Sequence, residues 1–406
     1  MPLPITLSKV ILYQIGQLLA GCSFYLFVLF LDDFAFLGAF SLTYAAIIVV
    51  ANLATFGIHE FQYFLYDKHS DSSHYFQSIF WNLLFLYLTL ATLILCLLWS
   101  FNLVFFSNIY MLVVIVFALN KILLGYTISQ GQAVLAAAAQ LGRASLLFVA
   151  AIFVMWHDIA HQLAWCFVFA EAPICLALCL KQRVTQFGRL SLVVPALIRR
   201  SLALLPHLTL TELFIRVDIL TLSLFVDARL LGIYAFFAFI TEGILQLLYG
   251  VRVHVIGQMR RLITLILNTQ KTQKRRRLST HINRIHLFSV AIAALGCAGG
   301  ITFTYLISIL NPTPLLYIHV LFILSAGLLV YALIYPFELI FIFLGKPSHQ
   351  SLFTLALNGV NVSLNFLFIP LYGITGAALA TTSSFILGSV LFGYVIRQHF
   401  PNLGRC

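Results

Sequence analysis

The chain has 406 residues, of which 62% are hydrophobic and 9% are charged, and its formal net charge is +11. A soluble domain carries about 25% charged residues, so this composition excludes a water-soluble globular protein. No Walker loop, nucleotide fingerprint or soluble catalytic segment interrupts the apolar runs, which argues against ATP-driven transport by this chain alone and against an enzyme with catalytic residues.

Apolar runs long enough to span a bilayer recur along the whole chain. A transmembrane helix needs about 20 such residues. Separating the runs at polar and Pro/Gly breaks predicts helices at 9–31, 37–58, 76–99, 108–130, 141–157, 160–180, 201–226, 230–252, 285–310, 314–344, 350–370 and 374–397. The long run at 314–344 contains Pro336, which predicts a kink or a tilt. We therefore expect an all-α polytopic membrane protein with about 12 transmembrane helices.

Lys and Arg residues predict the orientation of these helices, because cytoplasmic loops are enriched in them. Of the 23 Lys and Arg residues, 20 fall on one side, two (Lys121 and Arg216) lie within spans, and Arg229 alone lies on the other side. Both termini are therefore expected in the cytoplasm. The run "KTQKRRR" at 271–277 is interpreted as a cytoplasmic loop near anionic lipid rather than as a nucleic-acid patch.

Short motifs indicate an internal repeat. "DFAFLGAF" begins at Asp33 and "DARLLGIY" at Asp227, so both follow the pattern D-x3-L-G-x-[FY] at an offset of 194 residues. Each motif joins the first and second helices of a six-helix half. We expect two pseudo-symmetric six-helix lobes, at 1–182 and 201–406, joined by a basic cytoplasmic linker at 183–200.

Three stretches resemble one transporter family. "IRVDILTLSLFVDARLLGIYAFFAFITEGILQLLYGV" (215–251), "LALNGVNVSLNFLFIPLYGITGAALAT" (355–381) and "LGAFSLTYAAIIVVANLATFGI" (37–58) resemble helices of Wzx-type O-antigen and polysaccharide flippases. These belong to the multidrug/oligosaccharidyl-lipid/polysaccharide (MOP) exporter superfamily. The resemblance covers roughly a quarter of the chain, and it encodes no substrate.

The resemblance implies a V-shaped transporter with a central cavity in a bacterial inner membrane. Its implied substrate is an undecaprenyl-pyrophosphate-linked oligosaccharide, moved between leaflets by alternating access. A polysaccharide polymerase and a chain-length regulator are the expected protein partners, besides the lipid bilayer. No nucleic acid, metal or cofactor is expected, and an H⁺ or Na⁺ gradient is the candidate source of energy.

Ionisable residues inside apolar runs are the candidate site residues, because a charge at the bilayer centre costs about 2.5–3.5 kcal/mol or more. The cations Arg216 and Lys121, with Arg252 at the inner end of the eighth helix, suit a pyrophosphate. Glu212 is four residues from Arg216, so the two can also form a purely structural pair. Both interpretations remain open.

Two further sets of polar residues can likewise act either in transport or in helix packing. Asp218 and Glu242 are either coupling carboxylates or helix-pairing groups, with Lys121 and Arg252 as possible partners of Asp218. Asn358, Asn361 and Asn365 share one face of the eleventh helix, where they contact sugar or, as we favour, other helices.

Three other function classes are alternatives to the flippase. A drug/cation antiporter of the same superfamily would have an acid-lined lobe without the cations. A membrane-embedded glycan polymerase or transferase would carry a large external loop, whereas no external loop here exceeds roughly fifteen residues. A non-transporting scaffold would tolerate neutral residues at Arg216 and Lys121.

Overall fold

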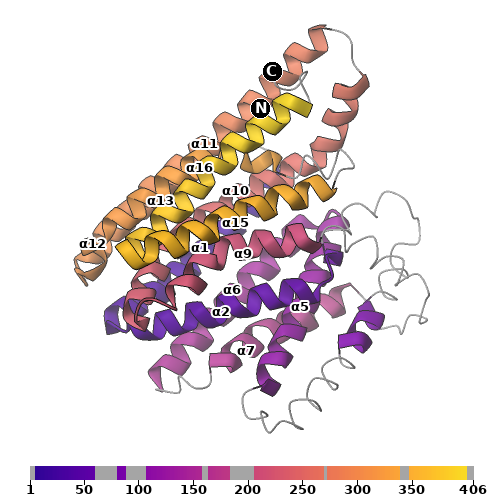
Figure 1. Cartoon of the computed structure of the whole chain (residues 1–406). Coiled ribbons are helices and arrows are strands. Elements are labelled where there is room, and N and C mark those ends of the chain that lie inside the picture. Colours follow the sequence, from indigo (N-terminus) through magenta and orange to yellow (C-terminus); the bar gives the residue numbers. More distant parts are fainter. Residues whose placement is uncertain are drawn as a thin grey trace. The chain divides into compact units, whose positions relative to one another are not determined.

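The computed structural model describes residues 5–59, 80–87, 107–157, 163–182, 205–268, 272–338 and 347–399. Within these ranges all the regular elements are helices (Figure 1), which confirms the predicted all-α class. Nine of the described helices are long and apolar enough to cross a membrane. The expected span at 76–99 and the expected linker at 183–200 lie largely or wholly outside the described residues.

The helices form two compact units. Unit 1 comprises Met1–Phe24 and Leu42–Glu212, and unit 2 comprises Tyr25–Ser41 and Leu213–Cys406. Three helices contribute to both units: α1 (Ile5–Leu31), α2 (Phe34–Ala54) and α9 (Leu205–Leu222). The remaining described helices of unit 1 are α5 (Ser107–Ser129), α6 (Ala133–Trp156) and α7 (Leu163–Lys181), and α7 packs against both of the others.

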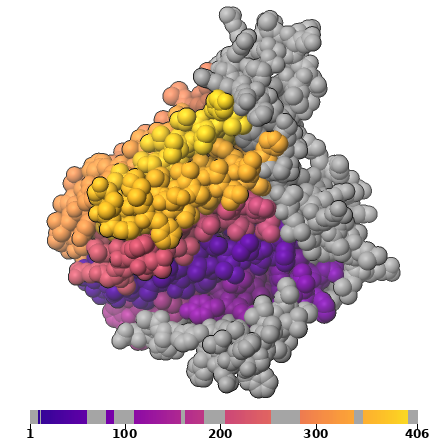
Figure 2. Space-filling view, viewed as in Figure 1, coloured from indigo at the N-terminus to yellow at the C-terminus, as the bar shows by residue number. Residues whose placement is uncertain are grey.

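Unit 2 is built around two groups of packed helices. Its elements are α10 (Ala228–Asn268), α11 (Thr272–Ser308), α12 (Thr313–Leu316), α13 (Ile318–Tyr331), the 3₁₀ helix η3 (Tyr335–Phe337), α15 (Pro347–Tyr372) and α16 (Ile374–His399). The α16 helix packs against α13 and α15, and α10 packs against α11. Figure 2 shows α15 and α16 side by side on the surface of this unit.

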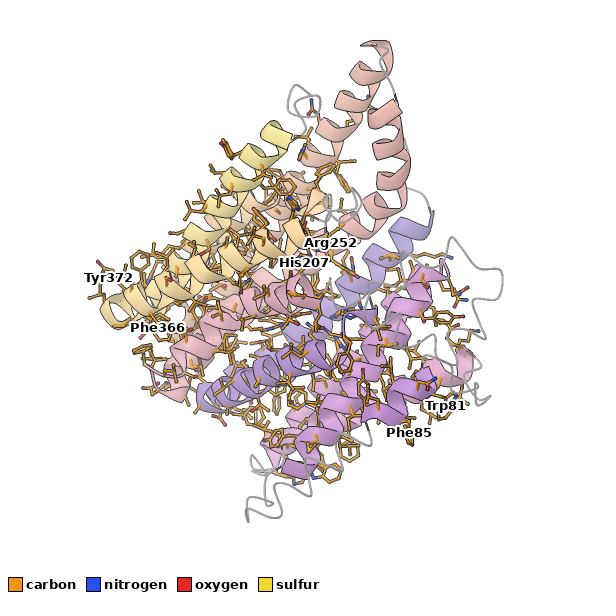
Figure 3. The ribbon with its side chains drawn as sticks, turned by 45° about the vertical axis from the view of Figure 1, so that its right-hand side comes forward. Trp81, Phe85, His207, Arg252, Phe366 and Tyr372 are labelled. Atoms are coloured by element: carbon orange, nitrogen blue, oxygen red, sulfur yellow. The ribbon has the colours of Figure 1, made fainter. Side chains whose placement is uncertain are left out.

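The surface of α15 suits a lipid environment. Phe366 and Tyr372 are half or more exposed (50% and 58%) and point away from the other helices of unit 2 in Figure 3. Large exposed apolar side chains recur on the other membrane-length helices as well. Such a surface is not stable in water but is favourable against hydrocarbon, so the chain is a multi-pass membrane protein.

Three expected elements differ from the structure. The single helix expected at 314–344 is divided, as far as it is described, into α12, α13 and η3, with breaks at Tyr317 and before η3, at whose start Pro336 lies. The α10 helix does not end at Arg252 but continues to Asn268. The α6 helix begins at Ala133 rather than at residue 141, so Arg143, one of the 20 cations counted on the cytoplasmic side, lies in the middle of a membrane-length helix.

The repeated motifs lie against each other in unit 2. Asp33 and Asp227 each accept a hydrogen bond from the backbone N–H three residues later, at 3.0 and 2.8 Å, and so cap α2 and α10. One turn on, Gly38 lies against the carbonyl group of residue 228, and Gly232 lies against that of residue 34. The two helices therefore cross backbone to backbone, where a Cβ atom on either glycine would overlap a carbonyl oxygen.

Candidate functional site

Lys121 is the central cation of unit 1. Its Nζ donates hydrogen bonds to Oδ1 of Asn52 at 2.7 Å and to Oε1 of Glu212 at 2.9 Å. The side chains of Lys121 and Glu212 are 14% and 25% exposed, so this ion pair is half-buried rather than sealed. Glu212 thus binds a cation on α5, 91 residues earlier in the chain.

Arg216 lies one turn further along α9, in unit 2. Its guanidinium binds Oε1 of Glu242 on α10 at 2.5 Å, and the two side chains are 10% and 20% exposed. The structure therefore gives Glu212 a cation partner on α5 and Arg216 a carboxylate partner on α10, so each member of the pair that their spacing of four residues allowed has a partner on another helix.

Asp218 is buried and bound by hydroxyl and backbone groups. The Tyr234 hydroxyl donates to Oδ2, and the N–H of Ile219 donates to Oδ1 at 2.8 Å. Lys121 and Arg252, its expected partners, instead bind Glu212 and Glu338. Asp218 also lines a cavity of about 30 Å³ within unit 2, whose other polar side chains are Thr241, Glu242 and Thr381. Such a volume holds one or two waters or one small cation.

Arg252 belongs to a more closed ion pair than Lys121 and Arg216 do, because its partner Glu338 is less exposed than Glu212 or Glu242. It binds Oε2 of Glu338 at 3.2 Å, and both side chains are less than a tenth exposed (9% and 7%). Its guanidinium carbon lies 5.1 Å and 5.0 Å from the ring centres of Tyr249 and Tyr335. Figure 3 shows Arg252 among the helices of unit 2. This environment favours a structural role for Arg252.

The three asparagines of α15 are all buried. Asn361 donates to the backbone carbonyl of Phe214 on α9 at 3.3 Å. Asn365 donates to the backbone and side-chain oxygens of Asn361 at 3.0 and 3.1 Å, and Asn358 donates to the carbonyl of Thr354 at 2.9 Å. The Asn361 bond ties α15 to α9, as helix-packing amides do, whereas the bonds given for Asn358 and Asn365 lie within α15.

Sequence reasoning missed a second charged cluster in unit 1. Arg143 on α6 pairs with Glu171 on α7, with NH1 and Oε1 3.6 Å apart, and Glu171 is almost completely buried (2% exposed). Asn120, which precedes Lys121 on α5, donates to Oε2 of Glu171 at 2.6 Å. The Ala-rich stretch 133–140 was the available signal, since alanine has the highest helix propensity and extends α6 back to Ala133, which leaves Arg143 in the middle of the helix.

His59 adds no charge near Lys121. His59 follows α2, and its Nδ1 lies 2.9 Å from the Thr55 hydroxyl. Burial, and then the positive charge of Lys121, lowers the pKa of His59 to about 3, so the ring is neutral at physiological pH. Among the described residues, no group of three His, Cys, Asp or Glu side chains could hold a metal ion.

Comparison with solved structures identifies the fold. The lipid II flippase MurJ in an inward closed conformation matches 95% of this chain and 87% of its own, with a TM-score of 0.70 and 14% identity. An inward-facing MATE-family multidrug resistance transporter of the MOP superfamily matches 96% of each chain, with a TM-score of 0.68 and 13% identity. A MOP superfamily transporter from Pyrococcus furiosus is described as having a binding pocket of reversed polarity. It matches 97% of this chain and 95% of its own, with a TM-score of 0.66 and 11% identity.

No family model and no curated protein matches the sequence. The chain is therefore a multi-pass membrane protein with the two-lobed fold of the MOP superfamily transporters, and at these identities the likeness concerns the fold alone.

Proposed function

We propose that this chain is a flippase that moves an undecaprenyl-pyrophosphate-linked oligosaccharide, of the O-antigen or capsule type, across a bacterial inner membrane by alternating access. The observation that carries the proposal is that two cations within apolar helices of this fold, Lys121 in unit 1 and Arg216 in unit 2, are each paired with a partly exposed carboxylate. The substrate's lipid chain stays in the bilayer, so the protein needs to accommodate only the pyrophosphate and the sugar.

Pyrophosphate suits these two cations chemically. It is a polyanion with many acceptor oxygens, and it binds well to the fork of an arginine and to the point charge of a lysine. Each cation is held by a partly exposed carboxylate, Glu212 or Glu242, which keeps it stable in the absence of substrate. A phosphate can replace that carboxylate without leaving the cation unpaired.

The cavity in unit 2 supports coupling to an ion gradient. At about 30 Å³ it is far too small for a sugar, but it matches one small cation or a proton-carrying water. Two carboxylates and two threonine hydroxyls line it, which is a hard-oxygen environment. We infer that Asp218 and Glu242 bind H⁺ or Na⁺ in one state of the cycle.

The same cavity is the observation that favours a second candidate, a drug/cation antiporter, because it is lined by acids. The two candidates differ in what Lys121 and Arg216 do. An antiporter of cationic drugs has no use for intramembrane cations that attract anions, whereas a flippase for a pyrophosphate-linked sugar requires them.

Complementation tests the proposal. We would express the chain in a bacterium that lacks its polysaccharide flippase and measure surface glycan by gel. Lys121→Ala and Arg216→Ala are the test variants, and Arg229→Ala is the control, since Arg229 is 59% exposed in a surface pair with Asp32. Protein levels in the membrane are compared by immunoblot.

We expect the wild type and Arg229→Ala to restore glycan, and the two test variants to lose at least about 90% of it. If all four proteins restore glycan, Lys121 and Arg216 are not required for transport. Drug resistance without glycan export would establish the antiporter instead.

A further inference from the structure

Arg143 is a cation in the middle of the apolar helix α6. Among the described residues, it has no carboxylate within hydrogen-bonding distance. Its side chain is 15% exposed, and NH1 is 3.6 Å from Glu171, which is beyond hydrogen-bonding distance. In the part of the chain that the structure describes, its guanidinium makes no hydrogen bond, although it carries five N–H donors. An arginine in a membrane span normally uses these donors, because leaving them unpaired is expensive.

The position of Arg143 is nevertheless well defined. Asn120 donates to the side chain of Glu171 at 2.6 Å and to its backbone carbonyl at 3.3 Å, so the carboxylate has a fixed place. Asn120 and Glu171 are fully or almost fully buried (0% and 2% exposed). The charge of the buried Glu171 is thus held beside Arg143 by a neutral side chain, while the arginine's donors stay available.

Arg143 and Lys121 lie against the same aromatic ring, that of Phe117. The guanidinium carbon of Arg143 is 5.2 Å from the ring centre of Phe117, and Nζ of Lys121 is 5.8 Å from the same ring centre. The ring gives both cations a favourable surface through the cation–π interaction. Glu212, the partner of Lys121, also interacts electrostatically with Arg143. The four charged groups therefore form one cluster in unit 1.

We propose that Arg143 and Lys121 together bind the two phosphates of a lipid-linked pyrophosphate, with Asn120 and Glu171 as positioning residues for Arg143. This inference rests on the proposed flippase function and names the anion-binding residues of unit 1. Arg143 supplies a fork to one phosphate and Lys121 supplies a point charge to the other. The cluster contains two cations and two carboxylates, so it is balanced when empty and needs no other counter-ion.

Removing the cation and removing the carboxylate of the cluster are expected to change anion binding in opposite directions. Removing the cation at Arg143 weakens binding of an anion. Removing the negative charge of Glu171, with Glu171→Gln, keeps an oxygen for Asn120 but takes away a carboxylate that competes for Arg143, so binding becomes tighter. A residue that only stabilises the fold would produce a loss in both cases.

The test measures binding of a polyprenyl pyrophosphate without sugar to the full chain in nanodiscs of neutral lipid. Inorganic pyrophosphate and the corresponding polyprenyl alcohol are parallel probes that separate the phosphate contribution from the lipid contribution. The variants are Arg143→Gln, Arg143→Lys and Glu171→Gln, with Arg229→Gln as the matched exposed control. Gel filtration and thermal unfolding show whether each variant is folded.

We expect Kd to rise about tenfold or more for Arg143→Gln, to rise less for Arg143→Lys, and to fall about threefold for Glu171→Gln, with no change for Arg229→Gln. If the substitutions leave the Kd for polyprenyl alcohol unchanged, Arg143 acts on the phosphates and not on the lipid chain. Unchanged binding by folded Arg143→Gln and Arg143→Lys would overturn the role of Arg143 alone. Absence of binding by the wild type would overturn the flippase proposal with it.

Discussion

At the scale of single residues, burial separates the ion pairs into two kinds. Arg252 and Glu338 are each less than a tenth exposed, whereas Arg229 and Asp32 are more than half exposed. Water screens an exposed pair, and such pairs contribute about 0–1 kcal/mol. A buried pair cannot lose one member cheaply, because the remaining charge is then unpaired in a low-dielectric environment.

We therefore expect Arg252→Met to destabilise unit 2 by about 3–5 kcal/mol. The double variant Arg252→Met/Glu338→Met should regain most of this loss, because it removes both charges. Thermal unfolding in detergent measures the effect, with Arg229→Met as the control that changes little. If the single variant is stable but fails to bind polyprenyl pyrophosphate, Arg252 is a binding residue, as the sequence first suggested.

Asp218 provides a test of coupling. Asp218→Asn keeps the size of the side chain but cannot carry a charge or release a proton, so we expect gradient-driven transport in vesicles to fall by about tenfold or more. Binding of polyprenyl pyrophosphate should stay within about twofold of the wild type, because Asp218 lies in the small cavity of unit 2. The exposed Asp32→Asn is the control. Undiminished transport by Asp218→Asn would rule out this carboxylate as the coupling site.

The sequence predicted which residues are ionisable groups in the membrane, but not their partners. Glu212 and Arg216 were expected to be able to pair because four residues separate them. That rule identifies residues on one helical face and says nothing about the helix opposite. The partners, Lys121 and Glu242, lie 91 and 26 residues away, and only the packed helices bring them close.

At the scale of elements, helix type was more predictable than helix ends. Apolar runs marked the spans because hydrocarbon requires them. Hydropathy does not detect a helix that continues into polar sequence, as α10 does beyond Arg252. It also placed the start of the helix that contains Arg143 at residue 141, whereas α6 begins at Ala133. The internal repeat was visible as two short motifs, whereas their direct contact depends on packing.

The crossing of α2 and α10 makes a clear prediction for glycine. Gly38→Ala and Gly232→Ala each place a Cβ against a backbone oxygen, which cannot move away as a side chain can. We expect each to destabilise the protein by about 1–3 kcal/mol or more. Gly359→Ala and Gly393→Ala are matched controls, because a Cβ at those helical positions has open space. The controls should be neutral or slightly stabilising, by up to about 1 kcal/mol. Equal unfolding temperatures for all four variants would contradict the close crossing.

At the scale of the whole molecule, the distribution of Lys and Arg predicts that both termini lie in the cytoplasm. One consequence is that Arg229, at the start of α10 and well exposed, faces the opposite side. In a variant without the native cysteines, we expect Arg229→Cys to react with a membrane-impermeant maleimide added to intact cells. A fluorescent protein fused to the C-terminus should be protected from protease added outside. If Arg229→Cys is labelled only after lysis, Arg229 faces the cytoplasm and the predicted topology is wrong.

The crossing of the two repeats also has the geometry of a symmetric dimer interface. Gly38 contacts residue 228 and Gly232 contacts residue 34, so each glycine meets the residue four positions before the other. Contacts of this reciprocal kind arise where two identical subunits meet on a two-fold axis. The interface is what a homodimer of six-helix chains would leave behind after gene duplication and fusion, with both copies of its motif still under the same steric constraint.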